Sequence, residues 1–234
     1  MTWRKRSPYP IHPKHLLPTS WHYWYLPYLL PTDIVLDVGC ANLMHTIQIS
    51  RNCHRVIGFD FNINLLNTAN TSIKDQMVNN IPVFYANANQ NWAIKDNSFN
   101  CVIMLDVLEH LYHPQHCLKE IYRILGKNGS ILMSIPNKNT SWKILRKSVG
   151  LYAYSDPDHK QEFSQNEITQ ILSDNGFSIV RIEPVVYDTW LAGPIDIVSA
   201  ISQKIYFYLM QWKRNKALMH PTETTGFRIL AYKD

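Results

Sequence analysis

Short apolar segments rich in β-branched residues alternate along this chain with longer segments that have helical spacing. Strands are predicted at residues 34–37, 55–59, 82–85, 100–105 and 130–135, and helices at 42–50, 62–78 and 114–125. Asn62 is a candidate N-cap, Pro114 suits a first helical turn, and Gly126 suits a helix end. Regular alternation of strands and helices predicts an α/β fold built on a mostly parallel sheet.

The pattern changes after residue 136. An irregular insertion is expected over 137–163, followed by a helix that opens with the capping box Ser164 to Glu167 and ends at Gly176. A strand at 177–183, a helical insertion at 190–219 and a last strand at 227–232 complete the order. A terminal strand that returns like a hairpin would run antiparallel to the others. The two insertions are interpreted as lid or substrate segments of one domain over 32–234.

Residues 1–31 are interpreted as a separate N-terminal arm, broken by prolines and rich in aromatic residues. The net charge of +5 comes without a long Lys/Arg run or a recognition-helix pattern, so no nucleic-acid partner is expected. The four cysteines form no CxxC pair, which favours a reduced, cytoplasmic protein. We find no signal-peptide pattern and no apolar run long enough for a transmembrane helix.

Two acidic residues at predicted strand ends carry the first chemical signal. Asp37 and the turn from Gly39 follow one apolar run, and Asp60 ends the next run about 20 residues later. Gly39 allows a ligand to lie against the backbone, and Asp60 suits the two hydroxyls of a ribose. Asp37 would repel a pyrophosphate but would accept the ammonium group of an amino-acid tail. The pair therefore favours an adenosine-containing cofactor.

A second block makes the signal specific. It runs from Asp96 through Asp106-Val107-Leu108-Glu109-His110 to Leu111, and continues from Leu118 to Asn137. With the glycine turn, this block resembles class I S-adenosylmethionine-dependent methyltransferases, in the branch with a DVLEH-type motif that acts on small molecules. The resemblance implies a Rossmann-like, doubly wound, seven-stranded sheet with an antiparallel last strand and helical lid insertions.

The resemblance also implies site residues for S-adenosyl-L-methionine. Asp37 and the turn that includes Gly39, Cys40 and Ala41 would hold the methionine part, and Asp60 would hold the ribose. Phe61 would lie against the adenine, with residues 87–89 at its edge and Asp106 on the methionine side. The adenine-edge residues are Asn87, Ala88 and Asn89.

The chain departs from the family pattern at three positions. The second and third glycines of the turn are replaced by Ala41 and Leu43, and Leu43 could crowd or tilt the following helix. The family's acid near the adenine amino group corresponds to Ala88, although a neighbouring asparagine could accept the same hydrogen bond. All three departures bear on cofactor affinity.

Four neighbouring residues have the types found in metal sites: His110 in the DVLEH segment, and His113, His116 and Cys117 around the start of the third predicted helix. Zinc needs four ligands that converge from separated pairs, so the sequence favours no metal site here. His159 lies on the first insertion and is a candidate general base, unless it only packs or caps the lid. His110 is placed near the pocket by the resemblance and is the second candidate.

The function expected from these residues is methyl transfer by in-line displacement to a small molecule, and the aromatic, apolar C-terminal third suggests a hydrophobic one. Trp21, Tyr23, Trp24 and Tyr25 of the arm could close over the cofactor and steady its sulfonium. Two alternatives stay open: a methyltransferase fold that only binds partners, and an NAD(P)-dependent oxidoreductase. Residues 195–216 could roof a pocket, form a dimer face or lie on a membrane surface. The sequence leaves the oligomeric state open.

Overall fold

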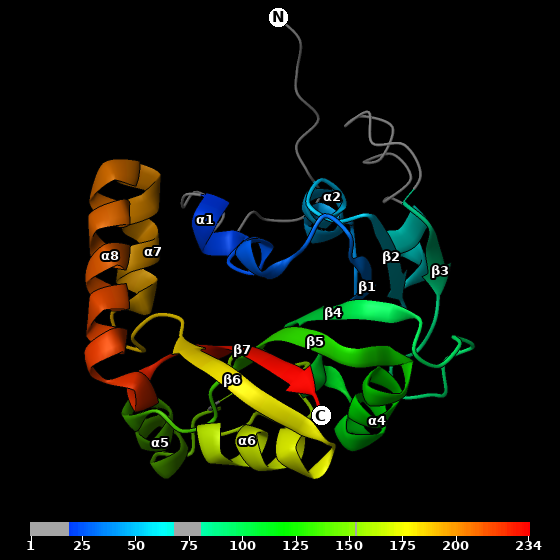
Figure 1. Cartoon of the computed structure of the whole chain (residues 1–234). Coiled ribbons are helices and arrows are strands. Elements are labelled where there is room, and N and C mark those ends of the chain that lie inside the picture. Colours follow the sequence, from blue (N-terminus) through cyan, green and yellow to red (C-terminus); the bar gives the residue numbers. More distant parts are fainter. Residues whose placement is uncertain (1–18, 68–80, 153) are drawn as a thin grey trace, which may run out of the picture.

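The computed structural model describes residues 19–67, 81–152 and 154–234 (Figure 1). Seven strands form one sheet in the order β3-β2-β1-β4-β5-β7-β6. Strand β7 runs antiparallel to both of its neighbours, β5 and β6, and the pairs among β1 to β5 are parallel. The strands are β1 (Ile34–Val38), β2 (Arg55–Asp60), β3 (Val83–Tyr85), β4 (Phe99–Leu105), β5 (Leu125–Pro136), β6 (Phe177–Pro184) and β7 (Gly226–Lys233). The predicted fold class is confirmed.

Helices cover both faces of the sheet, because alternate residues of each strand point to opposite sides. In β1, Leu36 and Val38 pack with apolar residues of α4 and α6, whereas Val35 packs with Ile47 of α2. Figure 1 accordingly draws α4, α5 and α6 on the side of the sheet away from α1 and α2. The α-helices are α1 (Thr19–His22), α2 (Met44–Ser50), α4 (Pro114–Ile124), α5 (Ser141–Ser148), α6 (Gln165–Asp174), α7 (Ala192–Ile201) and α8 (Gln203–Met219). Short 3-10 turns are η2 (Leu26–Tyr28), η3 (Leu108–His110) and η4 (Pro221–Glu223).

Several element boundaries differ from the prediction. Helix α2 starts at Met44 rather than residue 42, because Leu43 before it has a left-handed backbone. Helix α4 ends at Ile124, and Gly126 belongs to β5 because the backbone turns extended at Leu125 and pairs with Phe99. Of the predicted helix 62–78, the structure describes residues 63–67 as helical, and the rest lies outside the described residues. The Asn62 side chain accepts a hydrogen bond from Leu65 N, as expected of an N-cap.

The first insertion, 137–163, is not irregular throughout, since it contains α5. Thr140 caps this helix by accepting a hydrogen bond from Lys143 N. The capping box of Ser164 and Glu167 at the start of α6 is confirmed, with both reciprocal bonds present. The second insertion is helical as predicted, as two helices that meet at Ser202 and lie side by side beyond one edge of the sheet (Figure 1). Within the described part of the chain, no helix combines the length and apolarity needed to cross a bilayer.

The described end of the arm packs onto the domain. Tyr25 is fully buried in the cluster that contains Leu43 and Ile47, and its hydroxyl lies 2.7 Å from Nδ1 of His45. The guanidinium of Arg228 in β7 donates to the backbone oxygen of Trp21. Tyr25 is thus a buried residue of this core, and the closing of the arm's aromatic residues over a cofactor stays a prediction.

Candidate active site

The carboxyl ends of β1, β2 and β4 meet at one edge of the sheet, because β1 pairs in parallel with both other strands. Asp37 is the second-last residue of β1, Asp60 is the last residue of β2, and Asp106 directly follows β4. Chain order reverses between β1 and β4, and open α/β sheets bind ligands at such switch points. The structure thus brings the three predicted acids to the expected edge.

The turn after β1 keeps a glycine-type backbone although two of its residues are not glycine. Gly39, Ala41 and Leu43 have φ angles of 75°, 45° and 66°, all in the left-handed region. Gly39 N and Cys40 N both donate to the carbonyl oxygen of Phe59, at 2.9 and 3.0 Å. The Leu43 side chain does not crowd the helix against the strand, since it fills the core and α2 begins after it.

Asp60 is fixed by two backbone donors. Its Oδ2 accepts from Ala41 N at 2.9 Å and its Oδ1 accepts from Asn62 N at 2.8 Å. A carboxylate has about four acceptor sites, so each oxygen keeps capacity for one more donor such as a ribose hydroxyl. The next residue, Phe61, is 66% exposed and offers a free aromatic face beside this carboxylate.

Asp37 is buried and accepts from Thr46 Oγ1 at 2.6 Å. Burial raises the pKa of Asp37 to about 7; the Thr46 hydrogen bond opposes this rise and the charge of Asp60 adds to it. A cationic group placed beside this carboxyl would favour its ionised form. The site therefore suits a ligand with an ammonium or sulfonium group.

Asp106 is exposed and has a left-handed backbone with φ 54°. Its Oδ1 accepts from Ser134 Oγ at 2.7 Å, which links the ends of β4 and β5. The following residue, Val107, packs against the glycine turn so closely that a Cβ on Gly39 would lie 2.5 Å from Val107 Cγ2. Backbone strain of this kind collects at binding sites, and here it lies between two predicted cofactor segments.

The predicted adenine-edge residues have different surroundings. Asn89 Oδ1 accepts hydrogen bonds from the backbone N–H groups of Tyr112 and His113, at 2.8 and 3.0 Å. These bonds hold the loop after η3 in place. Asn87 Oδ1 accepts from Asn89 N at 2.9 Å, and Ala88 is buried in the core. The role of these residues at an adenine stays a prediction.

The four residues with a metal-site pattern do not converge. His113 and His116 line an open surface depression of about 630 Å³ that also borders Asn89. Cys117 is buried, with its sulfur 3.9 Å from that of Met104. His110 turns away from this group and lies against His159, with ring centroids 4.8 Å apart.

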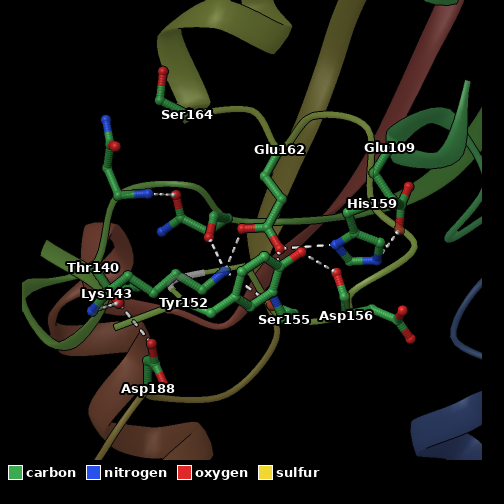
Figure 2. A network of polar contacts seen from close by, with 12 residues as sticks. Glu109, Thr140, Lys143, Tyr152, Ser155, Asp156, His159, Glu162, Ser164 and Asp188 are labelled. Atoms are coloured by element: carbon green, nitrogen blue, oxygen red, sulfur yellow. Dashed lines mark hydrogen bonds and ion pairs between the residues drawn. The ribbon is translucent and has the colours of Figure 1, made fainter. Parts of the chain in front are cut away.

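His159 lies in a buried polar network (Figure 2). Its Nδ1 is 2.9 Å from Glu162 Oε1, its Nε2 is 3.9 Å from Glu109 Oε1, and its side chain is 7% exposed. Lys143 Nζ donates to the other Glu162 oxygen. Both ring nitrogens therefore face carboxylates, and the proposed base function of His159 stays a prediction.

Sequence reasoning missed Glu109 and Glu162. Burial raises the pKa of Glu109 well above its ordinary value, and nearby carboxylates, Asp106 first, add to the rise. Burial opposes ionisation of Glu162 as well, but hydrogen bonds from Lys143, Ser155 N and His159 hold its pKa below its ordinary value. Glu109 lies between the apolar Leu108 and His110, and an acid at this position was the sequence signal that could have identified it as a site residue.

The two insertions enclose a second depression of about 470 Å³. Its walls carry three tryptophans from separate segments, together with Tyr187 and Lys216. The Lys216 ammonium lies 4.1 Å from the centroid of the Tyr187 ring. The tryptophans are Trp142, Trp190 and Trp212.

Comparison with known proteins agrees with this geometry. Residues 14–182 match a family model described as a methyltransferase domain. The chain is 23% identical over 159 residues to a ubiquinone biosynthesis O-methyltransferase of Rickettsia akari, a match that covers 66% of this chain and 62% of the relative. The chain spans about six-tenths of the length of two such curated relatives from Rickettsia (62% and 64%).

Solved structures share the fold. A S-adenosylmethionine-dependent methyltransferase from Methanosarcina mazei superposes with a TM-score of 0.62 at 19% identity, over 93% of this chain and 98% of the other. The [4+2]-cyclase SpnF superposes with a TM-score of 0.63 at 15% identity, over 87% and 75%. At these identities the likeness concerns the fold.

Proposed function

The chain belongs to the methyltransferase-domain family, and from this premise we propose that it transfers a methyl group from S-adenosylmethionine to a small, apolar acceptor. The observation that carries the proposal is the joint position of Asp37, the left-handed turn and Asp60 at the switch point of the sheet. The cofactor supplies an activated methyl group on a positive sulfur. The protein has to align the reactants and exclude water.

Each residue of this edge has a proposed task that follows from its chemistry. Asp37 accepts from the ammonium group of the methionine part, the backbone of Gly39 to Ala41 supports that part, and Asp60 accepts from the ribose hydroxyls. Phe61 offers its exposed ring to the adenine, and Asp106 borders the reacting end.

The lid segments support an apolar acceptor. The depression between the insertions is lined by three tryptophans and a tyrosine, and large aromatic side chains bind apolar, planar molecules well. Ubiquinone biosynthesis O-methyltransferases are among the relatives, and a phenol with an apolar substituent would fit both observations. We therefore start an acceptor screen with apolar phenols.

The α7–α8 pair supports a further element of the proposal, contact with a membrane surface by a protein that otherwise works in the cytoplasm. Ile197, Ile201 and Ile205 near the α7–α8 junction are 67%, 80% and 53% exposed. Exposed apolar side chains on a projecting helix pair can enter the headgroup region of a bilayer. Co-sedimentation with lipid vesicles, compared between the wild type and Ile201→Ser, tests this contact.

Calorimetric titration with S-adenosylmethionine and S-adenosylhomocysteine tests the proposed function. We expect micromolar binding that is lost in Asp60→Ala and kept in Asp174→Ala, an exposed acid on α6. Binding without any methyl transfer in the acceptor screen would favour the alternative of a binding protein with this fold. Absence of binding by folded protein would refute the proposal, and binding of NAD(P) in its place would favour an oxidoreductase.

A further inference from the structure

We propose that Glu109, His110 and His159 form a binding site for one divalent transition-metal ion, with zinc as the best fit, between the turn after β4 and the lid. One potential ligand atom from each of these residues lies within 4.8 Å of the other two. Glu109 and His110 belong to η3, whereas His159 comes from the insertion 137–163. Figure 2 shows the Glu109 and His159 side chains facing each other. The ion would therefore join two segments about 50 residues apart in the chain.

An unsatisfied polar atom points to a missing ligand at this place. Glu109 is 1% exposed, and its Oε2 has no hydrogen-bond partner among the described residues. Its other oxygen is 3.9 Å from His159 Nε2, too far for a hydrogen bond. A buried carboxylate oxygen without a partner is costly, and a cation between Glu109 and His159 would satisfy it.

The spacing is close to that of a metal site. Zinc lies about 2.0–2.2 Å from nitrogen and oxygen ligands, so two ligand atoms on a tetrahedral ion are about 3.4 Å apart. His159 Nε2 and Glu109 Oε1 are 3.9 Å apart, about half an ångström more than this separation. The widest separation in the group is at most 4.8 Å, and side-chain rotations that bring these atoms about 1–1.5 Å closer would complete the site.

A second observation concerns the other side of the His159 ring. Nδ1 lies 2.9 Å from Glu162 Oε1, and this carboxylate is held by Lys143 and by Ser155 N. Metal-binding histidines nearly always donate their second N–H to a carboxylate or carbonyl, which fixes the tautomer that leaves the other nitrogen free to bind the ion. Glu162 thus has the position of an orienting carboxylate.

The ligand types decide the class of ion. Two imidazoles and one carboxylate suit zinc and other first-row transition metals, whereas magnesium and calcium prefer oxygen ligands. Three protein ligands leave an open position on a four-coordinate ion. Use of that position by an acceptor oxygen rests on the proposed function, whereas the site itself does not.

Metal titration of the full chain tests the inference. Chelator-treated protein is titrated with Zn²⁺ by calorimetry and with Co²⁺ by visible absorption, which reports nitrogen and oxygen coordination directly. We expect one ion per chain, an affinity loss above about 100-fold in His159→Ala and Glu109→Gln, and a loss of about 10–100-fold in Glu162→Gln. Zn²⁺ should also raise the melting temperature of the wild type and not that of His159→Ala.

Matched controls come from the two histidines at the start of α4, His113 and His116, which lie outside the cluster. His113→Ala and His116→Ala should bind Zn²⁺ as the wild type does. Absence of stoichiometric binding, equal binding by His159→Ala, or loss of binding in either control would overturn the inference. Titration of the same samples with S-adenosylhomocysteine separates the two proposals, since a protein that takes up no added zinc but binds this nucleoside refutes the metal site alone.

Discussion

Replacing Ala41 by glycine tests whether the turn after β1 is strained. Ala41 has φ 45°, and a left-handed backbone costs a residue with a Cβ about 1–2 kcal/mol, whereas glycine adopts it freely. Glycine also gives the unfolded chain more freedom, which lowers stability by about 0.4–1 kcal/mol. The difference predicts a net stabilisation of about 0.5–1 kcal/mol for Ala41→Gly. In a chain of this size that raises the melting temperature by about 1–4 °C.

The same substitution elsewhere supplies the control. Ala200 is exposed within helix α7, where glycine costs about 1 kcal/mol relative to alanine. Thermal and urea unfolding of the wild type, Ala41→Gly and Ala200→Gly should therefore give changes of opposite sign. A loss of stability in Ala41→Gly equal to that in Ala200→Gly would refute the strain argument.

Leu43 shows where burial outweighs strain. Its φ of 66° carries a similar cost, but its side chain is fully buried. Removal of a buried leucine side chain costs about 2–5 kcal/mol, more than the strain that glycine would relieve. Leu43→Gly should therefore destabilise the chain by at least about 1 kcal/mol, although the family pattern has glycine here. A stabilised Leu43→Gly would contradict this ordering of the two effects.

Three further predictions concern the site and its lid. Because the pKa of Asp37 is about 7 when folded and near 4 when unfolded, its contribution to stability is complete below pH 4 and is lost as pH rises to 7; Asp37→Asn should remove this slope from melting curves. Gly39→Ala should destabilise the chain by about 1–3 kcal/mol in urea unfolding, and adding Val107→Ala should recover part of the loss, since the new Cβ meets Val107 Cγ2 at 2.5 Å. Lys143→Met leaves Glu162 buried without its cation and should cost about 3–5 kcal/mol, and the double variant with Glu162→Gln should cost less; equal losses would contradict the pairing.

The sequence predicted the features that depend on residues close together in the chain. Alternating apolar segments indicated the strands, and the spacing from Asp37 to Asp60 indicated two acids at the ends of successive strands, which pair as β1 and β2. The capping box at Ser164 could be recognised because its two partners, Ser164 and Glu167, are three residues apart in the chain. Such signals need no knowledge of distant contacts.

Contacts between distant segments were not predictable in this way. Lys143 and Glu162 are 19 residues apart, and neither has a pattern that identifies the other as its partner. Tyr25 was expected to close over the cofactor with the other aromatic residues of the arm, and no local pattern indicated its burial or its hydrogen bond to His45, 20 residues further on. Burial decides both cases, and burial depends on how the whole chain folds.

Glu109 connects the two halves of the candidate site. Its carbonyl oxygen accepts from Lys160 N and Gln161 N of the lid at 2.8 and 3.2 Å, and its carboxylate faces His159. Three residues earlier, Asp106 lies at the proposed cofactor edge. The insertion 137–163 and this edge are thus anchored on one short turn. Under the proposed function, a displacement of the insertion as the acceptor enters would be transmitted to Asp106, so residues of the insertion would influence both acceptor choice and the alignment of the methyl group.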